Sequence, residues 1–251
     1  MTELLILYQA NGMDHLKPAT KKDYENILVR LDKTFGHLEI GRLKSNQVAH
    51  WLETRKRIGR GGIRVNREMA VLSAAYNFGM RHMYVEFNPC RGVHRNTERP
   101  KKRYVTNEQF LDVFNRANEP FQDLLAVAYL TGCRQTDLIS WSRAAHLKPE
   151  GISYIQSKTR KPHTVEWSDA VRHFVRRAMD RFPDCELVFN NTLGYGWSVS
   201  GIASQLKRLK AGWSFKDLRA KAQTDSAHSV LGHGAALEAT YRKVLRTKPV
   251  R

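Results

Sequence analysis

The segment YLTGCRQTDLISW, residues 129–141, joins the end of one predicted helix to the start of another. Gly132 is a helix-stopping residue, Arg134 stands where the next helix would begin, and Asp137 follows one turn later. An arginine in such a place can form two hydrogen bonds to a phosphate while nearby backbone amides add positive potential. A solvated arginine paired with Asp137 is the alternative, and the segment taken alone favours it.

Two shorter basic motifs follow later in the chain. QSKTRKP, residues 156–162, places Lys158 at the tip of a predicted hairpin, where a lysine is most often a surface residue. WSFKDLRAK, residues 213–221, places Lys216 and Arg219 three positions apart on one face of a predicted helix. Each motif alone is too common to indicate a function.

The chain carries a large positive charge. Its 251 residues include 42 lysines and arginines against 24 aspartates and glutamates, which gives a formal net charge of +18 at pH 7. Basic residues outnumber acidic ones in residues 1–97 and again in residues 98–251. A charge spread over both halves favours a long polyanion, and we expect double-stranded DNA. An acidic membrane surface is the weaker alternative, since no basic amphipathic anchor or lipidation motif stands out.

Several functional classes lack their sequence signatures. Apolar stretches such as residues 124–130 are far too short to span a bilayer, and the N-terminus shows no secretory signal. Cys90, Cys133 and Cys185 are odd in number and far apart, which favours a reducing, cytoplasmic setting over a disulfide framework. No P-loop, HExxH, CxxC or GxSxG motif occurs, so we expect neither a metal nor a cofactor.

The spacing of apolar residues predicts two regions. Residues 20–36, 44–57 and 64–83 each read as a helix with one apolar face, as in a small bundle. Residues 98–105 belong to a basic, proline-containing stretch that we assign as an interdomain linker. Residues 151–168 alternate like a β-hairpin among further helices. The predicted fold class is mainly α with a small β-hairpin or sheet (α+β).

One more segment completes a specific order of motifs. LGHGAALEATYRK, residues 231–243, holds a glycine-flanked histidine, His233, and a single tyrosine, Tyr241, before two basic residues. Together with TGCRQTDLISW, QSKTRKPHTVEW and SFKDLRAK, it resembles the motif set of the tyrosine recombinase, or phage integrase, family over most of the chain. The resemblance implies a helical core-type DNA-binding domain in residues 1–97 and a catalytic domain in residues 106–251.

The resemblance also implies a catalytic set: Arg134, Lys158, Lys216, Arg219, His233 and Tyr241. In this family the two arginines hold the scissile phosphate, the tyrosine attacks it, and the hairpin lysine protonates the leaving 5′-hydroxyl. His233 and Lys216 would hydrogen-bond the phosphate or assist proton transfer from Tyr241. The family more often has histidine where Lys216 stands, and the interval of eight residues from His233 to Tyr241 is one shorter than usual.

Basic residues outside the catalytic set are further candidates for DNA contact. We expect Arg64 and Arg67 of the third N-terminal helix to meet phosphates, with a solvated helix face as the alternative. In the linker, Lys101, Lys102 and Arg103 would follow the DNA backbone. No β-rich arm-binding domain precedes the helical region, so we expect a compact or a truncated member of the family.

The implied assembly is a homotetramer on two DNA duplexes that could be a monomer free in solution, with an accessory DNA-bending protein as a further candidate partner. The implied reaction is site-specific recombination without metal or ATP. Two other functions stay open. One is a non-catalytic DNA-binding protein, in which Tyr241 would be dispensable. The other is a type IB topoisomerase-like enzyme, which would relax supercoils without paired sites.

Overall fold

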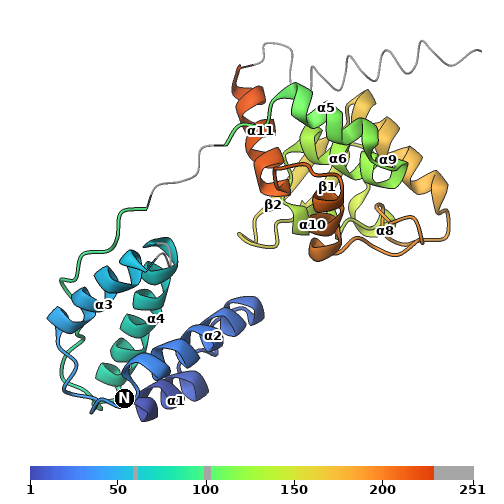
Figure 1. Ribbon diagram of the computed structural model, residues 1–251. Helices are drawn as coiled ribbons and strands as arrows, with labels where there is room; N and C mark the ends of the chain where they lie inside the picture. The colour runs from blue at the N-terminus through green and yellow to red at the C-terminus, as the bar shows by residue number, and fades with distance from the viewer. Residues whose placement is uncertain (59–61, 99–102, 229–251) are drawn as a thin grey trace, which may run out of the picture. The chain divides into compact units, whose positions relative to one another are not determined.

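The computed structural model describes residues 1–58, 62–98 and 103–228 of the chain. The chain divides into two compact units, Met1–Lys101 and Lys102–Arg251, and each is described by itself (Figure 1). Helices dominate both units, and the sheet found in the described residues has two strands. The predicted class, mainly α with a small β-hairpin, is therefore confirmed. None of the described helices is both long and apolar enough to cross a membrane.

The first unit is a helical bundle. Its helices are α1 (Thr2–Asn11), α2 (Pro18–Phe35), α3 (Ser45–Arg57) and α4 (Gly62–Arg81). Helix α4 packs against the other three, and its buried Leu72 and Tyr76 belong to the apolar core of this unit. The sequence predicts α2, α3 and α4 but not α1, because the apolar residues of α1 run consecutively instead of at helical spacing.

A buried carboxylate fastens two of these helices to α4. The side chain of Glu68 in α4 is only 1% exposed. It accepts hydrogen bonds from Arg30 Nε of α2 at 2.8 Å and from Arg55 Nη2 of α3 at 2.7 Å. A charge buried this deeply is tolerated only when it is paired. Three helices of the bundle are thus joined through one ion cluster.

The second unit is organised around a buried helix, α6. Its helices are α5 (Asn107–Arg116), α6 (Glu119–Thr131), α7 (Gln135–Leu138), α8 (Arg143–His146), α9 (Asp169–Arg181), α10 (Val199–Arg208) and α11 (Phe215–His228), and its strands are β1 (Gly151–Ile155) and β2 (Pro162–Glu166). Helix α6 packs against α9 and α11. Asn118 caps its start by accepting a hydrogen bond from Phe121 N, and Gly132 ends it in the left-handed conformation at φ +60°. These two fixed ends give the turn after α6 a defined position.

The hairpin lies beside that turn. Strands β1 and β2 pair antiparallel, with Ile152 opposite Val165 and Tyr154 opposite His163. Ile152 and Tyr154 are buried, and the ring of Tyr154 packs against that of Trp141 with centroids 5.6 Å apart. The apolar face of β1 therefore holds the hairpin on the core, and its turn is carried close to α7.

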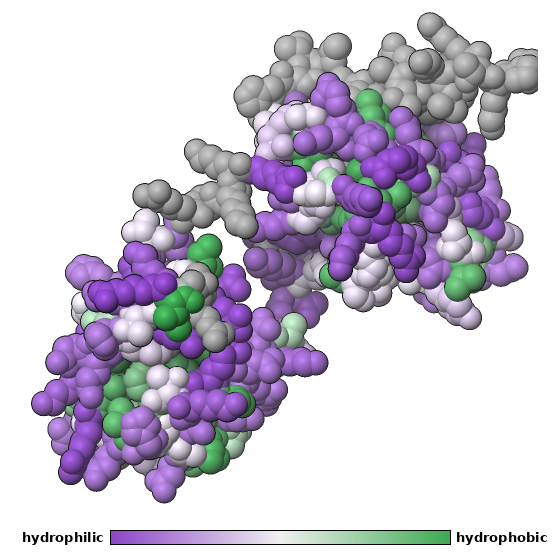
Figure 2. Space-filling view, in the orientation of Figure 1, coloured by the Kyte–Doolittle hydropathy of each residue, from purple (hydrophilic) through white to green (hydrophobic). Residues whose placement is uncertain are grey.

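The visible face of each unit is mainly hydrophilic, with small separate apolar patches (Figure 2). The largest exposed apolar side chains of the second unit include Leu193 and Tyr195, from the loop before α10, and Ile155, at the end of β1. Single exposed apolar residues of this kind are normal on a protein surface. The visible face of each unit accordingly offers no broad apolar surface among its described residues.

Candidate active site

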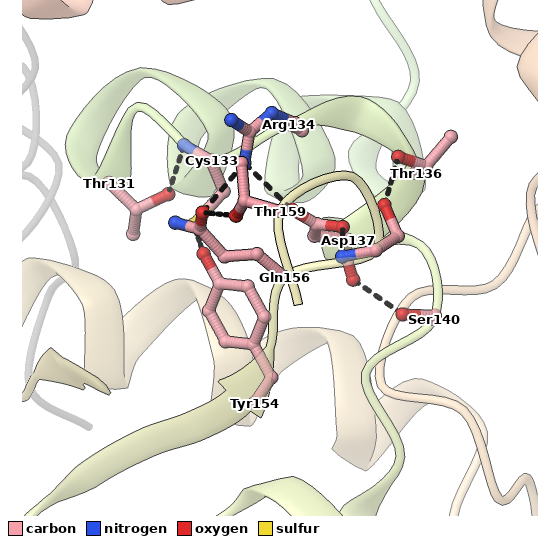
Figure 3. Close-up of polar contacts among 10 residues, drawn as sticks. Thr131, Cys133, Arg134, Thr136, Asp137, Ser140, Tyr154, Gln156 and Thr159 are labelled. Atoms are coloured by element: carbon pink, nitrogen blue, oxygen red, sulfur yellow. Dashed lines mark hydrogen bonds and ion pairs between the residues drawn. The ribbon is translucent and has the colours of Figure 1, made fainter. Parts of the chain in front are cut away.

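Arg134 stands at the joint between α6 and α7, two residues after Gly132. Its side chain is one quarter exposed, and its Nη1 donates a hydrogen bond to Gln156 Oε1 of the hairpin turn at 2.9 Å (Figure 3). The distance from Nη1 to Asp137 Oδ2 is 3.7 Å, which is an ion pair without a hydrogen bond. The guanidinium is therefore aimed at the hairpin and is only loosely neutralised.

Asp137 connects α7 to the hairpin instead of forming a solvated pair with Arg134. The carboxylate is buried, and its Oδ1 accepts a hydrogen bond from the backbone amide of Ser157 at 2.9 Å. The hydroxyls of Thr136 and Ser157 lie 3.2 Å apart and form a second link (Figure 3). The alternative of a solvated Arg134–Asp137 pair is thus not what the structure shows.

Lys158 follows the anchored Ser157 directly and is exposed in the turn between β1 and β2. The turn is closed by hydrogen bonds from Gln156 N to Lys161 O and from Arg160 N to Gln156 O, each 2.9 Å long. Arg160 adopts a positive φ of 58°, so the chain reverses tightly at this point. The lysine is carried on a short turn with one firmly held end.

Arg219 and Lys216 both lie in α11, one turn apart. Ser214 precedes the helix, and its amide and hydroxyl donate to Asp217 Oδ2, each at 2.8 Å, which fixes the start of α11. Arg219 is half-buried and lines a small cavity, whereas Lys216 is exposed and is not among the residues that line it. The structure therefore brings Arg219, but not Lys216, to this cavity.

The cavity has a volume of about 150 Å³. It lies between the end of α6, the hairpin and α11, and its lining residues are Thr131, Gly132, Cys133, Tyr154, Gln156, His163, Arg219, Ala222 and Gln223. Gln156 is the same residue that accepts the hydrogen bond of Arg134. Arg219 and the hydrogen-bond partner of Arg134 thus line the same cavity.

Two further polar groups of the cavity wall are held in their neutral forms. Cys133 Sγ and the Tyr154 hydroxyl lie 3.0 Å apart in a hydrogen bond. Burial raises the pKa of the Cys133 thiol, and burial likewise raises the pKa of the Tyr154 phenol, with Arg219 opposing both shifts. Neither group is a nucleophile at neutral pH, which fits the packing role that the sequence favours for Cys133.

The remaining predicted residues fall into two groups. His233, Tyr241, Lys101 and Lys102 lie outside the described residues. Arg103 is exposed at the start of the second unit. Arg64 and Arg67 are exposed on α4, where they line a groove of about 1020 Å³ together with Arg30 of α2. In this groove Arg64 lies 3.8 Å from the buried Glu68.

Sequence reasoning missed the buried lysine of α11. Lys221 is fully buried, and its Nζ donates to Asn107 Oδ1 at 2.6 Å and contacts Asp225 Oδ2 at 2.9 Å. Asp225 in turn accepts hydrogen bonds from the hydroxyls of Tyr104 and Tyr129. The available signal was its spacing of three residues from Leu218, which lies on the buried face of the same helix. This cluster fixes the rotation of α11, and with it the direction of Arg219.

Nothing in the described part of the chain resembles a metal site, since no group of three or more His, Cys, Asp or Glu side chains comes together there. Gln156 and His163 are two further polar residues of the cavity wall that the sequence analysis did not single out. Both lie on the hairpin, where only the strand register places them at the cavity.

Comparison with known proteins adds one sequence relative. No protein-family profile matches the chain. The integrase of Escherichia phage P2 is 25% identical over 148 residues, which are 55% of this chain and 42% of that protein. The match therefore spans less than half the length of the relative.

Solved structures match over nearly the whole chain. A lambda integrase dimer bound to a COC′ core site has a TM-score of 0.79 at 15% identity, covering all of this chain and 79% of that one. A lambda integrase tetramer bound to a Holliday junction has a TM-score of 0.79 at 14% identity, covering 91% and 73%. The Tn1549 transposon integrase in complex with circular intermediate DNA has a TM-score of 0.73 at 15% identity, covering 92% and 88%. The chain thus has the fold of these integrases and a partial sequence match to the phage P2 integrase, and both agree with the order of the basic motifs.

Proposed function

We propose that the chain is a site-specific DNA recombinase that cuts and rejoins double-stranded DNA through a 3′-phosphotyrosine intermediate. The observation that carries the proposal is that Arg219 lines a cavity large enough for a phosphate group, while Arg134 bonds Gln156 of the same cavity wall. A guanidinium in the cavity wall and a second one bonded to a residue of that wall favour a phosphate, since each can donate two hydrogen bonds to its oxygens. The relatedness to a phage integrase supports the same conclusion.

The proposed reaction is a transesterification. The hydroxyl oxygen of Tyr241 bonds to the scissile phosphorus while the bond from phosphorus to the 5′-oxygen breaks. The tyrosine proton passes to His233 as the neighbouring base, and Lys158 supplies a proton to the departing 5′-oxygen. Arg134 and Arg219 stabilise the charge on the non-bridging oxygens. One phosphoester replaces another, so rejoining needs no external energy source.

The proposed partners follow from charge and from the neighbours. A net charge of +18 supports binding to the phosphate backbone, with Arg64 and Arg67 in the first unit and Lys101, Lys102 and Arg103 between the units. The structural neighbours include a dimer on a core site and a tetramer on a Holliday junction. We extend this to a homotetramer on DNA for this chain, which would act in the cytoplasm, with an accessory DNA-bending protein as a further partner.

The test is covalent trapping on a nicked suicide duplex. Duplexes covering the sequences that flank the gene are incubated with the protein, and adducts that survive denaturation are separated by gel. We expect an adduct with the unaltered chain and none with Tyr241→Phe, because the phenol oxygen is the atom that forms the bond. Tyr195→Phe is the matched control, since Tyr195 is 70% exposed on the second unit, and it should leave the adduct unchanged.

Other outcomes point to the two remaining functions. Specific DNA binding without any adduct, equal for the unaltered chain and Tyr241→Phe, would contradict the proposal and indicate a DNA-binding protein. An adduct accompanied by relaxation of supercoiled DNA that carries no paired sites would indicate a topoisomerase-like enzyme instead.

A further inference from the structure

His163 is a histidine of the cavity wall that the motif analysis did not use. It lies in β2 directly opposite Tyr154 of β1. Residues directly opposite each other in an antiparallel pair place their side chains on the same face of the sheet. Tyr154 faces the cavity and His163 lines it as well, on its more exposed side. The imidazole is therefore accessible at the rim of the space that Arg219 borders.

The orientation of this imidazole is set by its neighbours. The rings of His163 and Tyr154 meet edge to face, with centroids 5.5 Å apart and an interplanar angle of 77°. Tyr154 is itself held by the hydrogen bond between its hydroxyl and Cys133 Sγ at 3.0 Å. The contact thus supports one side of a ring that belongs to a residue of the cavity wall.

The chemistry of the wall selects an anion. Arg219 contributes a permanent positive charge, His163 an imidazole, and Gln156 and Gln223 contribute side-chain amides. None of the described lining residues is an aspartate or a glutamate. Asp137, the acidic residue of the neighbouring turn, directs its Oδ1 at the backbone amide of Ser157. A small cavity bordered by a guanidinium and an imidazole suits a phosphoryl oxygen.

We propose that His163 is a further catalytic residue, whose imidazole donates a hydrogen bond to one non-bridging oxygen of the scissile phosphate beside Arg219. This inference rests on the proposed recombinase function. In this arrangement the hairpin supplies two groups to the reaction from opposite ends of its turn. Lys158 acts on the departing oxygen, and His163 stabilises charge on an oxygen that stays with phosphorus.

The first experiment measures single-turnover formation of the DNA adduct with His163→Ala and His163→Gln. Loss of a hydrogen bond to a charged group should slow cleavage by His163→Ala by about 10- to 100-fold, with DNA affinity nearly unchanged. Gln retains a side-chain N–H donor, so His163→Gln should recover part of the rate. Thr164→Ala is the matched control, because Thr164 is the next residue of β2 and bonds Ser153 on the opposite face of the hairpin.

The second experiment locates the contact on the substrate. Two suicide duplexes are made in which one or the other non-bridging oxygen of the scissile phosphate is replaced by a methyl group. On the isomer that lacks the oxygen bound by His163, His163→Ala and the unaltered chain should cleave at equal rates. On the other isomer the difference between them should persist. Equal losses on both isomers would overturn the contact.

A third substrate separates His163 from an indirect effect through Lys158. A 5′-bridging phosphorothiolate has a sulfur leaving group that needs no protonation, so it should restore cleavage by Lys158→Ala. It should not restore cleavage by His163→Ala. Restoration of both would show that His163 acts only by positioning the lysine, and the inference would be wrong.

Failure of the inference and failure of the proposed function give different results. If the unaltered chain forms no adduct with any of these duplexes, the recombinase function and the inference fall together. If it forms the adduct and His163→Ala matches it on the native phosphate, the inference alone is refuted. Since the His163 side chain is exposed, an unchanged melting temperature of His163→Ala and His163→Gln is expected and excludes misfolding as the cause of a slow rate.

Discussion

The arginines that hold the helices together differ from those at the cavity in what they face. In the second unit, Asp123 of α6 is fully buried and accepts hydrogen bonds from Arg177 at 2.6 Å and Arg181 at 2.8 Å, both from α9. In the first unit, Glu68 plays the same part for Arg30 and Arg55. Each of these arginines is engaged by a buried carboxylate.

Within the described part of the chain, Arg134 and Arg219 lack such a close carboxylate: one bonds a side-chain amide, and the other lines the cavity. Arg134 donates to the neutral Gln156 and stays 3.7 Å from its nearest carboxylate. Arg219 has no carboxylate partner among the residues that the structure describes. An arginine without close neutralisation retains its attraction for an external anion. A structural arginine is therefore distinguished from a ligand-binding one by whether a carboxylate pairs with it closely, more than by the local density of charge.

The largest expected effect is on the Asp123 cluster. Asp123→Ala leaves Arg177 without its carboxylate and Arg181 with only the exposed Glu119, and we expect it to lower the free energy of unfolding by about 3–5 kcal/mol. Urea denaturation followed by circular dichroism measures this. Asp112→Ala is the control, because Asp112 forms an exposed pair with Arg116, and its removal should cause no measurable change. Equal effects of the two substitutions would show that the buried carboxylate contributes no more to stability than the exposed one.

The next prediction tests the two kinds of arginine against each other. Arg219→Ala should slow adduct formation by about 10²- to 10³-fold while the free energy of unfolding stays nearly the same, because it removes a group that stabilises transition-state charge. Arg177→Ala should do the reverse, lowering stability with little change in the rate per folded molecule. Single-turnover cleavage and urea denaturation of both variants give the four values. A loss of stability in Arg219→Ala as large as in Arg177→Ala would contradict the distinction.

A smaller effect is expected at the buried lysine. Lys221→Met removes the ammonium that pairs with Asp225 and bonds Asn107, and we expect a loss of about 1–3 kcal/mol in the free energy of unfolding. Thermal melting compares it with Lys207→Met, an exposed lysine of α10 that should be nearly neutral. Lys221 does not line the cavity, but it fixes the rotation of α11 and thereby the direction of Arg219. The variant should therefore also slow cleavage. An unchanged cleavage rate would limit Lys221 to stability.

The smallest effect is a dependence on pH. Burial raises the pKa of Asp225, but hydrogen bonds from Tyr129, Lys221 and Tyr104 outweigh it, so the pKa of this carboxyl is lowered on folding. A lowered folded pKa gives stability that is present above the unfolded value, about 3.9, and is lost as the pH falls toward the folded value. As the pH is lowered from 5, the free energy of unfolding should therefore fall less steeply in Asp225→Asn than in the unaltered chain. Identical slopes would contradict this assignment.

Sequence reasoning reached the residues whose neighbours along the chain define them. Arg134 follows a helix-ending glycine, Lys158 sits in a polar turn between alternating strands, and Arg219 belongs to a helical basic pair. These patterns are local, so the elements that carry the three residues could be predicted. The order of the motifs then supplied the family.

Prediction from the sequence failed where the role of a residue depends on tertiary contacts. Glu68, Asp123 and Lys221 look like ordinary surface charges of helices, and only the packing of other helices makes them interior ion clusters. His163 is a lone histidine in a strand, with no pattern of its own. Its place at the cavity follows from the strand register, because a shift of one residue would move its side chain to the other face of the hairpin.

The link between Asp137 and the hairpin has a consequence for tolerance to substitution. Asp137 accepts its bond from the main-chain amide of Ser157, which every amino acid except proline possesses. Position 157 can therefore vary widely without releasing the turn, while position 137 must keep an acceptor of suitable length. In a collection of variants selected for activity, position 137 should therefore vary little while position 157 varies freely. Covariation between the two positions would then fail to reveal that they are bonded.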